Sequence, residues 1–288
     1  MPTWVFETVV TPIVAALAFD HARRALGARH AAGELAALAA YGFTVEAVAM
    51  AVFATHTYDA SWRAAPLSVP LAVAVVWAAV ITSAMAVAGR HESSRGWRAF
   101  TAAVIAIALD LMIDPVATHA GLWDWTPPGP WLGVPIGNFV AWGVIVGAYA
   151  YGAELWAGTD RTTFQPLRRL ALAAACIVVL VLVATAWTSL GLERAFADGR
   201  GWGVWAAIQV VTLWRMLSRA PESSLAESSL PARLAATPGR GPEAVLCVLG
   251  LAFAVEAVRI AEPGVTVAAA GSLATIGIVI ARLRPGPS

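Results

Sequence analysis

The chain consists mainly of long apolar stretches separated by short polar connections. Nine of these stretches approach the roughly 20 residues that an α-helix needs to cross the hydrocarbon core of a bilayer. The first, seventh and eighth are short or carry charges, and the apolar runs are continuous, which disfavours the alternating pattern of a β-barrel. The pattern predicts an all-α polytopic transmembrane helix bundle of about seven to nine spans. The nine stretches are residues 3–19, 31–55, 67–89, 99–118, 135–157, 170–192, 202–218, 243–260 and 265–282.

Composition supports a membrane protein. Of the 288 residues, 59% are hydrophobic and 13% are charged, whereas roughly a quarter of the residues of a soluble domain are charged. The excess apolar surface must face lipid, so we expect a multi-pass protein of the cell membrane with the lipid bilayer around it. The first stretch lacks the charged flank and cleavage site of a secretory signal and is expected to be a retained span.

Charge and cysteine content weigh against two classes of partner. The formal net charge of +1 offers no overall attraction to nucleic acid. Cys176 and Cys247 lie inside apolar stretches, without the spacing of a disulfide framework or of a Cys/His metal site. We therefore expect neither a nucleic-acid partner nor a metal, and the sequence leaves the oligomeric state open.

The arginines predict an orientation in the membrane. All 19 basic residues are Arg, and nine alternating spans place 15 of them on one side and 4 on the other. Because basic residues concentrate on the cytoplasmic side of short connections, this asymmetry predicts an outer N-terminus and an inner C-terminus. The four arginines expected outside are Arg63, Arg194, Arg200 and Arg259.

One connection differs from the others in composition. Residues 219–242 are rich in Ser, Pro, Ala and Arg, which is typical of a flexible linker. The sequence therefore predicts a helix bundle over residues 1–218, a cytoplasmic linker over 219–242 and a C-terminal transmembrane helix pair over 243–288.

Carboxylates inside the predicted spans are candidates for function, because each costs roughly 3 kcal/mol at membrane depth on insertion scales. Asp110 and Asp114 are four residues apart and therefore lie on one face of a helix. Glu46 lies at a similar predicted depth, and His56 and Tyr58 follow just beyond the end of its span. The predicted topology brings these groups together in the outer half of the bilayer.

The connection between the fourth and fifth spans, residues 119–135, contains three Trp, four Pro and no Arg. Such a segment can be an interfacial aromatic belt with a rigid turn. For Trp131, a belt residue and a site residue fit the sequence about equally well. For Trp123 and Trp125, which follow the paired aspartates, we expect an aromatic wall over a site. Asn138 and Trp142 follow in the first two turns of the fifth span.

The carboxylates allow a structural and a catalytic interpretation. In the first, Asp110 and Asp114 form a network with Asn138 or with the backbone. In the second, two carboxyl groups so close in a low-dielectric setting share a proton and one of them acts as a general acid. Glu46 can be structural or a proton acceptor, and His56 can be a proton shuttle or an unremarkable loop residue.

Charged residues nearer the ends of the spans are expected to have structural roles. Glu7 and Glu34 are interpreted as interfacial or packing residues. Glu256 and Arg259 are three apart on one predicted helix and are expected to form an ion pair.

Several of these residues form a spaced set of motifs. The set resembles the membrane carotenoid biosynthesis family that includes bisanhydrobacterioruberin hydratase and γ-carotene 1',2'-hydratase, and the similarity covers roughly residues 40–155. Glu46, Tyr58, Pro70 and Trp77 are similar to an earlier segment of that family, with a looser match. The motifs are Asp110-Leu-Met-Ile-Asp114-Pro115-Val-Ala, Gly121-Leu-Trp123-Asp-Trp125 and Gly133-Val-Pro135-Ile-Gly-Asn138-Phe139-Val-Ala-Trp142.

The resemblance implies a cofactor-independent enzyme that adds water to the terminal double bond of an acyclic carotenoid. Asp110 and Asp114 would supply the acid, and Glu46 or the second aspartate would accept the proton of the attacking water. Aromatic faces, those of Trp123, Trp125 and Trp142, would stabilise the tertiary carbocation. His56, Tyr58 and Asn138 would complete the substrate-binding site.

Two other classes remain open on the sequence. An end-group cyclase or another isoprenoid-modifying enzyme would use the same acid and aromatic residues but exclude water. A proton-coupled carrier would use the carboxylates as relay groups and should have broken helices and polar groups that reach both faces. The inner halves of the predicted spans are nearly uncharged, which counts against a carrier.

Overall fold

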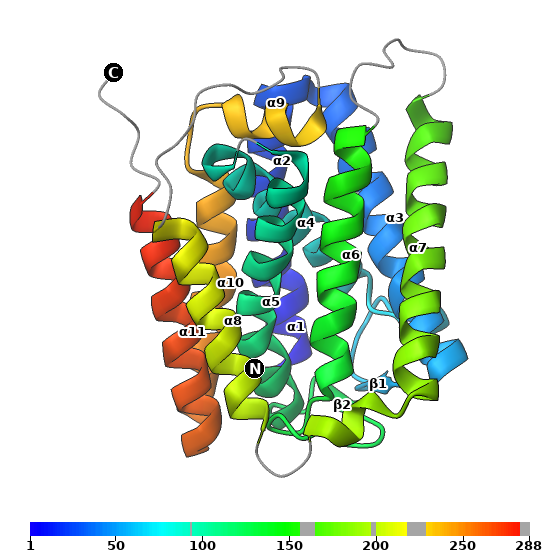
Figure 1. Cartoon of the computed structure of the whole chain (residues 1–288), viewed down its shortest axis with the longest axis vertical. Helices are drawn as coiled ribbons and strands as arrows, with labels where there is room; N and C mark the ends of the chain where they lie inside the picture. The colour runs from blue at the N-terminus through cyan, green and yellow to red at the C-terminus, as the bar shows by residue number, and fades with distance from the viewer. Residues whose placement is uncertain (93, 156–164, 197–199, 218–228, 283–288) are drawn as a thin grey trace.

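The computed structural model describes residues 1–92, 94–155, 165–196, 200–217 and 229–282. The chain forms a bundle of helices that run up and down along a common long axis (Figure 1). This confirms the predicted all-α polytopic fold. The first helix is continuous through α1 (Thr3–Val5), the π-helical turn η1 (Phe6–Val10) and α2 (Thr11–Leu26). The other long helices are α3 (Ala28–Phe53), α4 (Leu71–His91), α5 (Arg95–His119), α6 (Ile136–Leu155), α7 (Gln165–Ser189), α8 (Gly201–Leu217), α10 (Gly241–Ile260) and α11 (Pro263–Arg282).

Short elements occupy the two ends of the bundle. At one end, here named the β end, the three-residue strands β1 (His56–Tyr58) and β2 (Trp123–Trp125) pair antiparallel. The opposite end, the α9 end, carries the short helix α9 (Leu230–Ala236) (Figure 1). Two 3₁₀ turns, η2 (Pro66–Ser68) and η3 (Leu192–Phe196), lie in the connections before α4 and after α7.

Each of the nine predicted spans overlaps a helix. Among the described residues, seven helices are long and apolar enough to cross a membrane. The predicted ranges 202–218 and 243–260 correspond to α8 and α10, which lie alongside these seven (Figure 1). The structure is therefore compatible with the predicted number of about seven to nine spans. Which end of the bundle faces the cell interior stays a prediction.

Helix α5, which carries both aspartates, is the central helix of the bundle. In the most apolar 18-residue segment of α5, 94% of the residues are buried. In the corresponding segment of α7, at the edge of the bundle, 17% are buried. Pro115 lies inside this helix, and α5 continues to His119. Proline has no N–H for the carbonyl four residues earlier. That carbonyl, of Leu111, instead accepts the indole N–H of Trp131 at 3.4 Å.

Trp131 is a buried residue. Its side chain is 1% exposed, and its ring packs against Trp202 and Trp205 of α8 at centroid distances of 4.8 and 6.3 Å. An interfacial belt residue would instead hold its ring at the water boundary. The belt interpretation of Trp131 is therefore wrong, because α8 covers this part of the connection.

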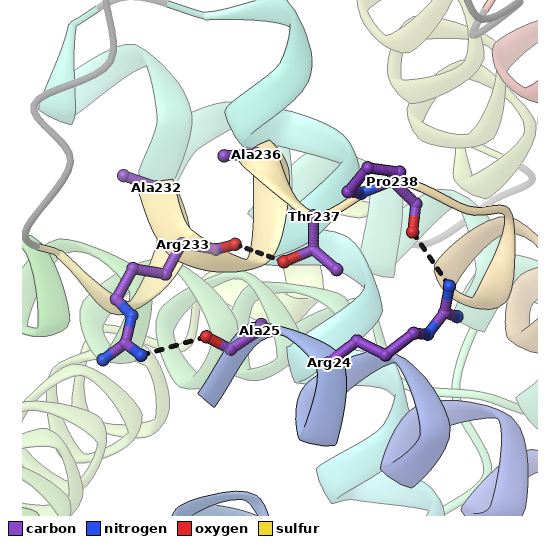
Figure 2. A pocket seen from close by; sticks show the side chains of 7 residues that line it. All are labelled: Arg24, Ala25, Ala232, Arg233, Ala236, Thr237 and Pro238. Atoms are coloured by element: carbon purple, nitrogen blue, oxygen red, sulfur yellow. Dashed lines mark hydrogen bonds between the residues drawn. The ribbon is translucent and has the colours of Figure 1, made fainter. Parts of the chain in front are cut away.

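The segment predicted as a flexible linker is partly helical. Residues 219–228 lie outside the described residues, but α9 begins soon after them, with the Ser229 hydroxyl as N-cap. Figure 2 shows how α9 is held: Arg233 donates to the carbonyl of Ala25 at 2.9 Å, and Arg24 donates to the carbonyl of Pro238 at 3.0 Å. Residues 230–236 are therefore helical, because α9 buries its apolar face against α2 and α4; the flexibility of the linker stays a prediction.

The predicted C-terminal helix pair is present as α10 and α11. Helix α10 packs against α2, α4 and α5, and α11 packs against α5 and α8. The predicted pair between Glu256 and Arg259 is confirmed, with Nε of Arg259 2.9 Å from Oε2 of Glu256. The amino group of Met1 joins the same carboxylate. These contacts make the pair part of the bundle that holds the candidate site.

Candidate functional site

A cavity of about 480 Å³ lies toward the β end, among α3, α4, α5, α6 and α7. It is lined mainly by apolar and aromatic side chains, with a few carboxyl, imidazole and amide groups. This composition is typical of a site for an apolar small molecule with a few polar groups for chemistry. The structure places eight of the nine predicted site residues on its wall: Glu46, His56, Tyr58, Asp114, Trp123, Trp125, Asn138 and Trp142.

The ninth predicted residue, Asp110, lies one turn deeper in α5 and does not line the cavity. The side-chain nitrogen of Asn138 donates to Oδ2 of Asp110 at 2.9 Å and also to Oδ2 of Asp114. Oδ1 of Asp110 is buried and has no hydrogen-bond partner among the described residues. Two buried carboxylates so close together repel each other, and the pair is more stable when the two groups share one proton. Asp114 can therefore present a proton to the cavity, with Asp110 behind it.

Glu46 forms a second and differently bonded carboxyl group. Its Oε1 accepts the indole N–H of Trp77 at 2.7 Å, and its Oε2 lies 3.1 Å from Nε2 of His56. The hydroxyl of Tyr58 also lies close to this carboxylate. A carboxylate that receives several donors is stabilised in its charged form. The cavity wall thus holds two carboxyl groups with different environments.

Pairing of β1 with β2 positions the polar and aromatic residues above the carboxylates. His56 pairs with Trp125 and Tyr58 pairs with Trp123, while Thr57 between them points outward. The imidazole of His56 is 5% exposed, and its Nδ1 lies 2.8 Å from the hydroxyl oxygen of Thr55. His56 is therefore a buried strand residue with a partner at each ring nitrogen, and its role as a proton shuttle stays a prediction.

Tyr58 lies outside the spanning helices, in β1. Burial, and next the negative charge of Glu46, raise the pKa of the Tyr58 hydroxyl well above its usual value. The phenol therefore stays protonated at physiological pH and keeps an O–H group beside Glu46.

Aromatic rings form two walls of the cavity. Trp77 and Trp142 lie with centroids 4.1 Å apart, and Tyr58 and Trp123 lie 5.7 Å apart, edge to face. The indole N–H of Trp125 is buried and has no partner within the described part of the chain. These faces can stabilise a cation within the cavity, because the ring quadrupole attracts positive charge.

The wall of the cavity also includes residues that the sequence did not indicate. The carboxylate of Glu193, in η3, accepts the backbone N–H groups of Ile136 and Gly137 at 2.7 and 2.9 Å. It also accepts the indole N–H of Trp187 at 3.1 Å. A carboxylate at the first turn of a helix is favoured by the helix dipole. Glu193 therefore fixes the end of α7 to the start of α6.

Trp77 is the other functional candidate missing from the predicted site, where it entered only through the looser part of the resemblance. It lies in the middle of an apolar helix and is 4% exposed. A signal was present, since a buried indole N–H usually requires a partner and Glu46 lies at a similar predicted depth.

Glu7 and Glu34 have structural roles, as expected. Oε1 of Glu7 accepts the backbone N–H groups of Arg63 and Ala64 at 3.0 and 3.4 Å and holds the connection before α4. Oε2 of Glu34 lies 2.6 Å from Nε of Arg169 in an ion pair at the opposite end of the bundle. Neither residue lines the cavity.

The fold and the site define a polytopic helical membrane protein with two carboxyl groups in one aromatic-walled apolar cavity. The family model described as "Carotenoid biosynthesis protein" matches residues 3–199. This is more than half of the chain, and the chain belongs to that family, which assigns it a role in carotenoid biosynthesis. Comparisons with curated proteins and with solved structures found no match.

Proposed function

We propose that the protein is a carotenoid 1,2-hydratase-like enzyme of the cell membrane, which adds water to the terminal double bond of an acyclic carotenoid. The observation that carries the proposal is that Asp114 and Glu46 line the same apolar cavity with different hydrogen-bond environments. Acid-catalysed hydration needs one group that gives a proton and another that receives one. Family membership supports a carotenoid as the substrate class.

In the first step, Asp114 transfers its proton to the CH carbon of the terminal double bond. The π electrons form the new C–H bond, and the positive charge develops on the neighbouring carbon, which bears two methyl groups. The side-chain N–H of Asn138, which donates to both Asp110 and Asp114, stabilises the resulting Asp114 carboxylate. The proton donor is thus supported from the side away from the substrate.

The tertiary carbocation then requires stabilisation without a bond to the protein. The rings of Trp77 and Trp142 on one wall and Trp123 on another line the space beside Asp114. A desolvated cation over an aromatic face gains about 2 kcal/mol. The carboxylate of Glu46 adds electrostatic attraction from the same cavity.

Water completes the reaction by attacking the cationic carbon through its oxygen. The proton it loses passes to the Glu46–His56 pair, whose atoms lie 3.1 Å apart. The product is a tertiary alcohol, and transfer of one proton from this pair back to Asp114 restores the starting state. The cavity lies at the β end, where water from the membrane boundary is near. The polyene meanwhile extends into the bilayer, and the reaction proceeds without a cofactor.

The alternatives differ in their products. An end-group cyclase would use the same acid and aromatic rings, and its product would have the mass of the substrate. A proton-coupled carrier would leave its ligand chemically unchanged. Helices α4, α5 and α6 are each unbroken, which gives no support to a carrier with discontinuous helices.

The test is expression of the chain in cells that make an acyclic carotenoid such as lycopene, with mass spectrometry of the extracted pigments. We expect products heavier than the substrate by one water for each reacted end. Cells carrying Asp114→Asn provide the control. Pigments of unchanged mass with every acyclic carotenoid offered would overturn the hydratase proposal, and a cyclic product of equal mass would favour the cyclase.

A further inference from the structure

We propose that the halves of α3 and α7 nearest the β end form a lateral opening between the cavity and the lipid. Through this opening the polyene chain of the substrate enters, and it stays there while the end group reacts. The identity of the occupant rests on the proposed function, whereas the opening itself rests on the packing of the two helices.

Toward the α9 end, α3 and α7 are joined. Glu34 of α3 forms the ion pair with Arg169 of α7, and the thiol of Cys176 in α7 lies close to the hydroxyl of Tyr41 in α3. The backbone of Gly33 also lies close to the Arg169 guanidinium, since a Cβ there would stand 2.9 Å from its Nη1. These contacts hold α3 and α7 close together toward the α9 end.

Toward the β end, burial decreases along both helices. In α7, Leu172, Cys176 and Leu180 are buried at four-residue intervals, and the positions that continue this face, Val183 and Ala184, are only half-buried.

Helix α3 shows the same change. Leu38, Tyr41 and Val45 are buried, whereas Val48 and Ala49 are half-buried. The half-buried residues of both helices line the cavity. The cavity therefore extends into the gap between these halves of α3 and α7.

Helix α7 is fixed on its other side. Glu193 joins the connection after α7 to the first turn of α6 through the N–H groups of Ile136 and Gly137. Helix α7 is thus held to α6 at the β end and to α3 at the α9 end. The remaining gap lies between α7 and α3 at the β end. Because α7 is an edge helix with only 17% of its apolar window buried, this space faces the hydrocarbon region.

The size and chemistry of the cavity indicate what occupies the opening. A cavity of about 480 Å³ matches sites for drug-sized molecules and holds an end group with a few isoprene units. A full-length carotenoid exceeds this volume, so most of its chain must leave the cavity. The side chains at the opening, Val48, Ala49, Val183 and Ala184, have no hydrogen-bonding groups. They suit a polyene and give no recognition to a polar molecule.

The experiment narrows the opening without touching the carboxylates. Ala49→Phe and Val183→Phe place a ring in the gap. Val52→Phe and Leu182→Phe are matched controls on the same helices, at positions that are 65% and 64% exposed. Each variant is expressed in cells that make lycopene, and its elution on size exclusion in detergent is compared with the wild type to verify folding.

We expect the carotenoid that copurifies per mole of protein to fall about tenfold in the cavity-side variants and to stay at the wild-type value in the controls. Hydrated product should fall in parallel, whereas a short acyclic isoprenoid with the same end group should still be converted. Folded cavity-side variants that retain wild-type amounts of carotenoid would overturn the opening. Wild-type protein that retains carotenoid without adding water would instead contradict the proposed function.

Discussion

Nε2 of His56 lies 3.1 Å from Oε2 of Glu46, so a residue of β1 is joined to the last third of α3 inside the bundle. The Thr55 hydroxyl oxygen, 2.8 Å from Nδ1, fixes the orientation of the imidazole. A histidine held between a carboxylate and a hydroxyl can receive a proton on one nitrogen while the other keeps its partner. This relationship separates the proton-accepting part of the site from the Asp110–Asp114 pair.

If Glu46 receives the proton of water, Glu46→Gln should block alcohol formation but leave protonation by Asp114 intact. In cells or membranes supplied with D₂O, the variant should make little hydrated product, a loss of roughly 10²-fold or more. The carbocation would still form and lose a proton again, so deuterium should appear in the recovered carotenoid. Mass spectrometry of both pigments measures the two effects. Recovered carotenoid free of deuterium, together with the loss of product, would assign Glu46 to the protonation step.

Asp114→Asn should abolish hydration, because an amide cannot protonate an alkene. We expect a fall of roughly 10²- to 10⁴-fold in the rate of product formation, measured by chromatography of pigments from cells with equal amounts of the protein. Asp110→Asn should have a smaller effect, since Asp110 does not line the cavity and acts through Asn138.

Asp124→Asn is the matched control for the aspartate variants. This variant also replaces an aspartate by an asparagine, but the side chain of Asp124, in β2, is exposed and points away from the cavity. It should retain wild-type activity. A fully active Asp114→Asn variant would remove Asp114 from the acid role.

Much of the fold could be predicted because the signal is local. An apolar run of bilayer length needs no tertiary contact to be recognised, and each of the nine predicted ranges overlaps a helix. Helix α9 was missed because its seven residues are too few for a periodic pattern. Its conformation depends on packing against α2 and α4, which lie far away in the sequence.

The candidate site could be predicted in part for the same reason. Asp110 and Asp114 are one turn apart, and their shared face follows from helix geometry alone. The pairing of β1 with β2 and the contact between Glu46 and Trp77 join segments from different parts of the chain. Three-residue strands carry no periodic signal, so the sequence could place His56 and Tyr58 near the site but could not show their partners.

Close packing of α3 on α4 holds Glu46 against Trp77 and leads to a stability prediction. A Cβ on Gly42 would stand 2.5 Å from Cβ of Trp77, too close for any side chain. Gly42→Ala should therefore destabilise the protein by about 1–3 kcal/mol, as expected for overpacking, and should reduce activity by displacing Trp77. Thermal unfolding in detergent measures the first effect. Gly277→Ala in α11, where nothing lies within 4 Å of an added Cβ, should be neutral, and equal unfolding temperatures for the two variants would contradict the packing argument.

The buried ion pair between Arg98 and Glu154 should stabilise the α9 end without contributing to the cavity chemistry. Nε of Arg98 lies 2.6 Å from Oε1 of Glu154, and the side chains are 3% and 1% exposed. Arg98→Met leaves the carboxylate buried without its counter-charge and should cost about 3–5 kcal/mol. The double variant Arg98→Met with Glu154→Leu removes both charges and should recover most of that loss. Thermal unfolding of the single and double variants checks this, and a double variant no more stable than the single one would show that Arg98 acts mainly through other partners.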